Sequence, residues 1–406
     1  MADNPYKASL DIGTNKIALL VADIDDDERL SIIANIVFPS EGIKKGSIHS
    51  IDALSRVLVK IMDQLYKSYG FVVDNFNVNL SDTHLTCTDG KGKIPIDEVI
   101  KNDDYDAVLK SATAMSTPTN KEKIHVITKK FTINEELIVD DPIGMKAEVL
   151  ESKVHIITVS SASVRNIENC FKQSKLEVGD IVLNPIAKSH AILSQEEKDN
   201  GVCIIDIGAG VTTYSVFHDE GIIRSGIIPM GGDEITQEIA YAFDTSFEEA
   251  SRLKENYGVA KSSTINEDTF ISFSQINNKD ECQLSRLQLS EVIEESYLEI
   301  FLILKNELKY HKLDKIINSG FVICGGGSEV ECCEELIRSF FVRRAKMGLI
   351  QRSKIKGNEA VLTDYQYSGA IGLLLHNKDS NRPNLISNNA NTGVMNNIRK
   401  KLIGNF

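Results

Sequence analysis

The tripeptide Asp-Ile-Gly occurs twice in the chain, at 11–13 and again at 206–208. Each copy lies between two short apolar runs, which predicts a β-hairpin with the glycine at its tip. Phosphate is bound by inward-pointing backbone N–H groups, and glycine permits the required turn because it has no Cβ. One Asp-x-Gly is common in ordinary turns, but two copies in equivalent places predict a pair of phosphate-binding loops.

The residues around the two motifs supply further polar groups. Asp11 and Asp206 stand just before each turn, where a carboxylate can hold Mg²⁺ through water because this ion keeps much of its hydration. We therefore predict both as water-mediated Mg²⁺ ligands. The predicted phosphate-binding set comprises Gly13, Thr14, Asn15, Lys16, Gly208, Ala209, Gly210, Thr212 and Thr213.

A third glycine-rich loop follows the apolar run 321–324 and consists of Gly325, Gly326, Gly327 and Ser328. Backbone approaches a nucleotide closely only where side chains are absent, and the helix expected at 331–340 offers its N-terminus to anions. A flexible strand–helix turn is the alternative interpretation. Together with the two hairpins, this loop predicts ATP as the ligand.

Two further positions are predicted to face the same ligand. Gly232 and Asp233 open a helix expected at 233–242, although simple helix capping by Asp233 is an alternative. Lys254 lies on a helix that ends at Gly258 and is placed to reach a ribose or adenine; a solvated lysine is the alternative.

The elements around the motifs repeat in the same order. Each copy reads strand, turn, strand, third strand and amphipathic helix, with the helices at 51–69 and 233–242. This repetition predicts an α/β fold of two related halves with the ligand in the cleft between them. A long helix is expected at 290–310, after an irregular stretch at 260–280.

Residues 84–165 are predicted to form a separate α+β unit inserted in the first half. The expected elements are a strand, a helix at 103–115, a strand at 124–133, a turn at 140–144 and a strand pair through 145–160. A helix at 161–173 and a strand at 181–183 then return the chain to the first half.

Length and composition narrow the class of protein. The 406 residues suffice for two or three domains, and the net charge of −13 argues against nucleic acid as a partner. The 7 Cys are scattered and mostly in apolar runs, which favours reduced buried thiols and a cytosolic location. The start of the chain does not resemble a signal peptide, and we expect no membrane-spanning helix.

The last residues have a different character. Residues 376–392 are polar and predict a flexible linker, and 393–406 predict an amphipathic helix without acidic side chains. Its apolar side chains are Val394, Met395, Ile398, Leu402, Ile403 and Phe406, and its basic ones are Arg399, Lys400 and Lys401. This pattern is typical of a helix that lies in the interface of a membrane with anionic lipids, although packing on the core or fraying is an alternative.

Taken together, the three glycine loops resemble the actin and sugar-kinase superfamily, and within it the chain resembles the FtsA family of bacterial cell-division proteins. The FtsA-like segments are 40–46, 201–208, 228–236 and 367–374, together with the insert. The resemblance implies an actin-like duplicated ATPase fold. The implied subdomains are 1A (1–83 and 166–195), the SHS2-like 1C (84–165), 2A (196–235 and 305–375) and 2B (236–304).

The resemblance also implies a role. Members polymerise, tether the FtsZ ring to the inner face of the cytoplasmic membrane at the division septum, and recruit later division proteins. The FtsZ C-terminal peptide is expected to dock at 236–304, later division proteins at 84–165, and anionic lipids at the terminal helix.

Two departures from the family pattern predict at most a slow ATPase. Asn184 stands near the expected position of the attacking water, and an amide cannot act as a general base. Ser251 replaces the Glu expected three residues before Lys254. ATP is then a conformational and assembly ligand. The alternatives are a sugar-type kinase, which needs a carboxylate base, a pilus-assembly ATPase and a chaperone-type ATPase.

Overall fold

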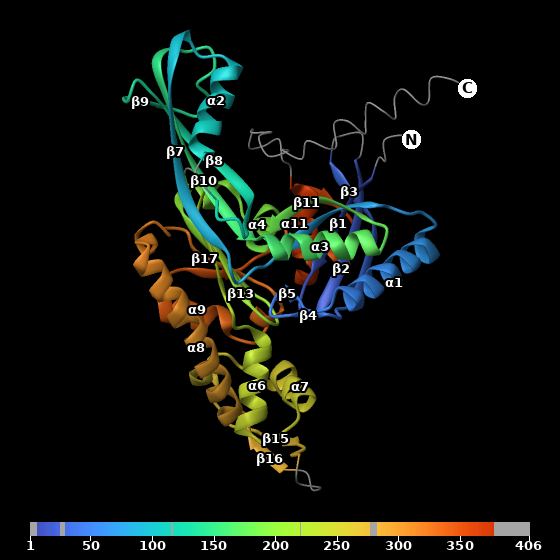
Figure 1. Cartoon of the computed structure of the whole chain (residues 1–406). Coiled ribbons are helices and arrows are strands. Elements are labelled where there is room, and N and C mark those ends of the chain that lie inside the picture. Colours follow the sequence, from blue (N-terminus) through green and yellow to red (C-terminus); the bar gives the residue numbers. More distant parts are fainter. Residues whose placement is uncertain (1–5, 25–28, 115–116, 220, 277–281, 377–406) are drawn as a thin grey trace, which may run out of the picture. The chain divides into compact units, whose positions relative to one another are not determined.

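The computed structural model describes residues 6–24, 29–114, 117–219, 221–276 and 282–376 (Figure 1). The chain divides into two compact units. Unit 1 contains Met1–Cys87, Thr117–His125 and Ile157–His376, and unit 2 contains Thr88–Ser116 and Val126–Ile156. The predicted linker beyond residue 376 and the predicted terminal helix 393–406 lie outside the described residues.

Unit 1 contains two sheets built in the same order. In the first, the antiparallel strands β1, β2 and β3 are followed by β6 and β11, which run parallel to β1, giving the order β11-β6-β1-β2-β3-β19. The second has the order β14-β13-β12-β17-β18 with the same pairing directions. The duplicated α/β fold predicted from the repeated motif is therefore confirmed.

The strands of the two sheets are β1 (Lys7–Ile12), β2 (Lys16–Ile24), β3 (Leu30–Pro39), β6 (Asn75–Leu80), β11 (Glu177–Leu183) and β19 (Ile355–Lys356), then β12 (Val202–Ile207), β13 (Thr212–His218), β14 (Gly221–Ile228), β17 (Gly320–Cys324) and β18 (Ala345–Met347). A short hairpin of β4 (Ile43–Lys44) and β5 (Ser47–Ile48) precedes the first helix.

The two helices that the sequence predicts in the first half, at 51–69 and 161–173, are confirmed, whereas two shorter helices after β11 were not predicted. Helix α1 (Ile51–Tyr69) begins at the Ser50 side chain, which accepts a hydrogen bond from the Ala53 N–H, and ends at Gly70 in the left-handed conformation. Its buried side chains recur every three to four residues and pack on the sheet with α3 (Ser161–Gln173). Helices α4 (Asn184–Ile192) and α5 (Gln195–Asn200) follow β11.

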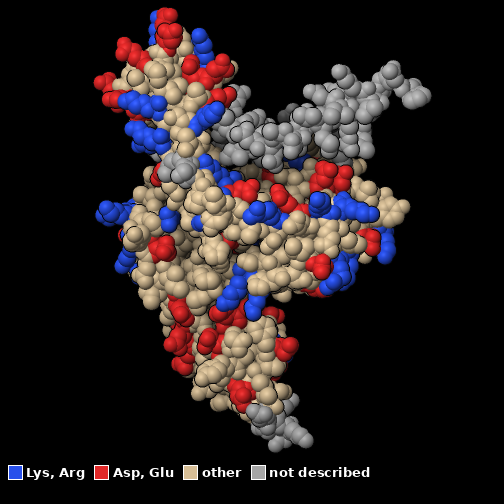
Figure 2. All heavy atoms as spheres, in the orientation of Figure 1, with Lys and Arg blue, Asp and Glu red and all other residues tan. Residues whose placement is uncertain are grey.

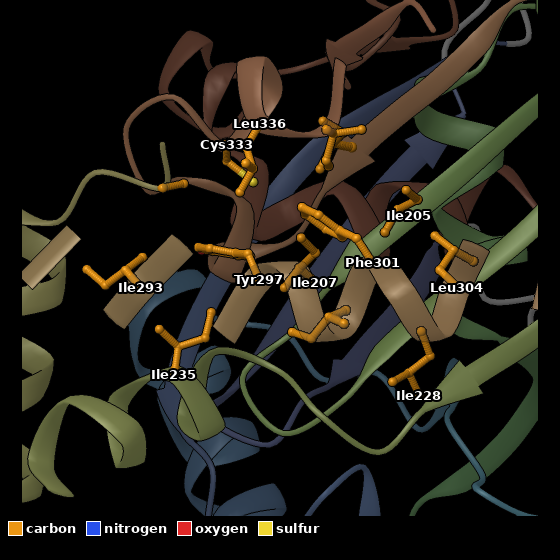
Figure 3. Packing of buried hydrophobic residues seen from close by; sticks show 14 of the residues in the cluster. Ile205, Ile207, Ile228, Ile235, Ile293, Tyr297, Phe301, Leu304, Cys333 and Leu336 are labelled. Carbon is orange, nitrogen blue, oxygen red and sulfur yellow. The ribbon is translucent and has the colours of Figure 1, made fainter. Parts of the chain in front are cut away.

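The second half buries its core around one long helix, α8 (Arg286–Tyr310). Tyr297 and Phe301 of α8 lie beside Ile205 and Ile207 of β12 (Figure 3). Helix α8 begins earlier than predicted because Ser285 caps it, accepting from the Gln288 N–H. The remaining elements are α6 (Gly232–Ala242), α7 (Phe247–Tyr257), η1 (Ser262–Thr264), β15 (Phe270–Phe273), β16 (Cys282–Ser285), η2 (Leu313–Lys315), η3 (Gly326–Ser328) and α9 (Cys333–Phe341).

The end of the described chain crosses back to the first half. Strand β19 pairs in parallel with β3, and α11 (Ser368–Leu375) packs on β1 and α4. The Ser9 hydroxyl donates to the Ala370 carbonyl at 2.8 Å. Assigning all of 305–375 to the second half was therefore wrong for these two elements, because their apolar faces are completed by the first sheet. Helix α10 (Glu359–Thr363) and turn η4 (Tyr365–Tyr367) connect them.

Unit 2 is a four-stranded sheet with one helix. The sheet order is β7-β10-β8-β9, and α2 (Asn102–Thr113) packs on it. Gly90 and Gly92 of β7 allow this approach, since a Cβ at either would lie within 2.3 Å of an α2 carbonyl. The strands are β7 (Thr86–Val99), β8 (Lys121–Ile133), β9 (Leu137–Val139) and β10 (Lys146–Ser160).

The strand pair predicted through 145–160 is wrong, because this segment is the single strand β10. It contains neither Gly nor Pro, so nothing in it terminates the extended backbone.

Among the helices of the described residues, none has the length and apolar character needed to cross a membrane.

Candidate nucleotide-binding site

The two Asp-Ile-Gly hairpins turn in the same way. The Gly13 N–H donates to the Lys16 carbonyl and the Gly208 N–H to the Val211 carbonyl, both at 2.9 Å. The second loop lies directly against the first. A Cβ at Gly210 would stand 2.9 Å from the Thr14 hydroxyl, so only glycine fits where the loops meet.

A chain of hydrogen bonds joins the two motif carboxylates. Asn79, buried on β6, donates to Asp11 Oδ1 at 2.5 Å and to Asn184 Oδ1 at 3.2 Å. Asn184, in the first turn of α4, donates to Asp206 Oδ2 at 2.5 Å. The side-chain oxygen Oδ1 of Asn79 accepts from the Ile12 N–H at 2.6 Å, which fixes the orientation of the side-chain amide.

Lys188 completes this network at its second-half end. It lies one turn after Asn184 on α4, is buried, and donates to Asp206 Oδ1 at 2.6 Å. Burial disfavours the ammonium, but the carboxylates of Asp206 and Asp11 outweigh this effect and raise the pKa of Lys188. Neither Asn79 nor Lys188 was predicted from the sequence. The only available signal was that Lys188 follows Asn184 by one helical turn in a helix whose other residues are apolar except for Ser189 and His190.

The first loop holds its charges in a partly buried setting. Burial raises the pKa of Asp11, although Lys188 acts in the opposite direction. Burial also lowers the pKa of Lys16, whose ammonium donates to Gln366 Oε1 at 3.4 Å. The Thr14 hydroxyl accepts from the Gly46 N–H at 3.2 Å, and Asn15 is exposed.

The second-loop threonines differ in their surroundings. Thr213 donates to Asp206 Oδ2 at 3.4 Å, so it supports the carboxylate. Thr212 is fully buried, and its hydroxyl has no hydrogen-bond partner among the described residues. Its hydroxyl remains available as a donor if the loops separate.

The start of α6 is bonded to the second phosphate loop. The Gly232 N–H donates to the Gly208 carbonyl at 2.9 Å, and the Asp233 N–H donates to the Ala209 carbonyl at 2.8 Å. The N-cap residue of α6 is Gly231, and no side chain makes a capping hydrogen bond at this helix start. The alternative of capping by Asp233 is therefore wrong. Loop carbonyls satisfy the first N–H groups instead.

Lys254 is directed at the same helix start. Its ammonium donates to the Gly232 carbonyl at 2.8 Å and to the Thr236 hydroxyl at 2.6 Å. Burial lowers its pKa. The alternative of a solvated lysine is therefore wrong, and the proximity of Lys254 to Gly232 places it beside the glycine loops.

The third glycine loop closes over Asp206. Gly325 has φ 90°, and a Cβ there would lie 2.3 Å from Asp206 Oδ1, whereas a Cβ at Gly326 would meet open space. Gly327 packs on Ile207, and its carbonyl accepts a hydrogen bond from the buried Tyr297 hydroxyl. The predicted glycine residues therefore converge on one site.

Two expectations about this loop need correction. The Ser328 hydroxyl is buried and donates to the Gly325 carbonyl at 2.6 Å, so it stabilises the loop rather than facing a ligand. The helix after the glycines begins only at Cys333, because the turn η3 and an irregular segment intervene. The helix N-terminus therefore lies two residues later than the expected start at 331.

The fit to Mg²⁺ differs between the two aspartates. Both oxygens of Asp206 already accept hydrogen bonds, one of them from an ammonium. Within the described residues, no three His, Cys, Asp or Glu side chains converge as a metal site. A hydrated ion held through water at Asp11 remains a prediction, and Lys188 competes with such an ion at Asp206.

Comparison with known proteins identifies the family. The model for "Cell division protein FtsA" matches residues 203–372, and the model for "SHS2 domain inserted in FTSA" matches residues 82–158. The cell-division protein FtsA of Pseudomonas aeruginosa is 30% identical over 368 residues, which cover 90% of this chain and 88% of that protein. The chain belongs to the FtsA family of cell-division proteins.

Solved structures support the fold. A PilM–PilN type IV pilus biogenesis complex matches with a TM-score of 0.63 at 14% identity, covering 93% of this chain and 99% of that chain. MreB5 of Spiroplasma citri bound to ADP matches with a TM-score of 0.56 at 15% identity, covering 99% of each chain. The FtsA-family chain therefore has the actin-like fold with an SHS2 insertion predicted from its sequence.

Proposed function

We propose that this FtsA-family chain binds ATP between its two halves and that ATP sets the conformation of a membrane-bound subunit. The observation that supports this proposal most directly is the chain of hydrogen bonds from Asp11 through Asn79 and Asn184 to Asp206, which couples the two proposed phosphate loops. MreB5 of Spiroplasma citri, which is similar in fold, is bound to ADP in its solved structure, and this supports a nucleotide as the ligand.

The nucleotide enters by separating the two loops. Gly210 lies against Thr14, and across the same junction Lys45 donates to Glu234 Oε1 at 2.9 Å. Both residues of this ion pair are partly exposed, so the pair adds little stability and opens easily. A phosphate bound between the two loops replaces their direct contact, because both loops then donate hydrogen bonds to the same phosphate. In this way ATP holds the two halves together.

Hydrolysis is proposed to be slow. The side-chain amide nitrogen of Asn184 donates a hydrogen bond to Asp206, and its amide oxygen accepts one from Asn79. The Asn184 side chain has no group that accepts a proton from water. Any Mg²⁺ that accompanies ATP is proposed to lie as a hydrated ion near Asp11 rather than at Asp206, which is paired with Lys188. The subunit polymerises, and unit 2 is the proposed contact for later division proteins.

The predicted terminal helix is proposed to tether the subunit to the membrane. Deleting 394–406 is expected to abolish sedimentation with vesicles that contain anionic lipid. ATP affinity is expected to stay unchanged, because this segment contains none of the predicted nucleotide-binding residues. Sedimentation and ATP titration of both proteins measure this. Neutral vesicles are the control, and a truncated protein that still pellets with anionic vesicles contradicts the tether.

The FtsZ tail is proposed to dock on the lobe formed by 236–304. This lobe exposes large apolar side chains, with Tyr241 at 85% and Phe270 at 71% exposure. Figure 2 shows largely uncharged surface over α6 and α7, bordered by acidic side chains. Exposed aromatic side chains on a folded lobe are typical of binding surfaces, because burying them on a partner is favourable.

The double variant Tyr241→Ser and Phe270→Ser is expected to weaken binding of an FtsZ C-terminal peptide by at least ~10-fold, since buried aromatic anchors dominate such interfaces. Fluorescence anisotropy of a labelled peptide measures the affinity. Tyr66→Ser on α1, also an exposed tyrosine, is the matched control. Equal affinity for the double variant and the control would place the docking site elsewhere.

A further inference from the structure

We propose that Lys188 is a built-in counter-ion that takes the place of a metal ion at the second phosphate loop, so that this chain binds ATP with little dependence on Mg²⁺. The inference rests on the proposed binding of ATP in the cleft. The cation that balances Asp206 and the phosphates is then an ammonium of the protein rather than a metal ion.

The position of Lys188 supports this role. Its Nζ lies 2.6 Å from Asp206 Oδ1, and both side chains are buried, with 10% and 2% of their surface exposed. The other carboxylate oxygen accepts from Asn184 at 2.5 Å and from Thr213 at 3.4 Å. Every oxygen of Asp206 therefore has a protein donor, and one of these donors carries a full positive charge.

A metal ion has little room beside this carboxylate. The backbone of Gly325 packs on Asp206 Oδ1 so closely that a Cβ there would stand 2.3 Å away. Mg²⁺ gives up its water reluctantly and needs octahedral space around it. To coordinate Asp206, even through water, it must displace Lys188, which leaves a buried ammonium without its partner, and that is costly.

Lys188 is also able to act on the phosphates. An ammonium has three N–H donors, and Asp206 takes one of them. Lys16, on the first loop, contributes a second ammonium near Asp11. The two lysines offset the charges of Asp11 and Asp206, although Glu329 and Asp364 also act on Lys16. They offer a triphosphate the fixed positive charge that most metal-dependent sites obtain from the ion.

The test measures the dissociation constant of ATP by calorimetry on the full chain, once with excess Mg²⁺ and once with EDTA. For the unsubstituted protein the two constants are expected to differ by less than ~5-fold. For Lys188→Met, which is similar in size but uncharged, the difference is expected to grow to at least ~50-fold, because Mg²⁺ must then neutralise Asp206. Lys188→Arg keeps the charge and is expected to retain weak metal dependence.

Lys305→Met is the matched control, since the Lys305 ammonium donates to the Phe340 carbonyl near the end of α9 at 3.3 Å rather than to a residue of the glycine loops. It is expected to keep the metal dependence of the unsubstituted protein. Tight ATP binding that requires Mg²⁺ in the unsubstituted protein would overturn the inference and leave the proposed function standing. Absence of ATP binding in both buffers would overturn both. If Lys188→Met does not fold, the unsubstituted protein and Lys188→Arg still decide.

Discussion

Asp206→Asn is expected to lower the free energy of unfolding by about 3–5 kcal/mol, the cost of leaving one member of a buried ion pair without its partner. Asp206 is 2% exposed, and the substitution keeps its shape while removing its charge. The Lys188 ammonium then remains buried without a carboxylate. Since domains are stable by only about 5–15 kcal/mol, the midpoint of urea unfolding measures this effect clearly.

The double variant Asp206→Asn and Lys188→Met separates charge from packing. Replacing both members removes the unpaired ammonium, so the double variant is expected to recover most of the lost stability. If Asp206→Asn alone were as stable as the unsubstituted protein, the Lys188 ammonium would have to be solvated when Asp206 is replaced. Equal instability of the single and double variants would mean that packing, not charge, sets the cost.

Gly325→Ala is expected to destabilise the protein by at least ~1–3 kcal/mol, because a backbone conformation that only glycine adopts readily must then carry a Cβ. Gly325 has φ 90° and ψ 152°. The added Cβ would also lie 2.5 Å from the Ile207 carbonyl oxygen and 2.3 Å from Asp206 Oδ1. Displacement of Asp206 is expected to weaken ATP binding by at least ~10-fold through loss of the network at the second loop.

Gly326→Ala is the matched control for stability. It adds the same methyl group one residue away, where a Cβ meets no atom within 4 Å. Its free energy of unfolding is expected to stay within ~1 kcal/mol of the unsubstituted protein. Chemical unfolding of the two variants, followed by ATP titration of each, compares them. Equal losses of unfolding free energy in both variants would show that the loop requires glycine for its general flexibility, and not because of the close contact at Gly325.

The local elements of unit 1 were predictable because each depends on neighbours in sequence. Two apolar runs around a glycine specify a hairpin, and helix 51–69 follows from apolar spacing between a serine cap and Gly70. Errors arose where local signals conflict with packing. The segment 145–160 contains enough polar residues to suggest two strands, yet pairing along a sheet keeps it as one.

The sequence by itself therefore determined the duplicated hairpins, the three glycine loops and the family. Only the tertiary structure decided how their charges are satisfied. Asn79 and Asp11 are far apart in the chain, and Lys188 would be expected to point to solvent if its helix were considered alone. A buried charge pair exists only where two folded surfaces meet, so no local pattern specifies it. The same reason explains why β19 and α11 return to the first sheet.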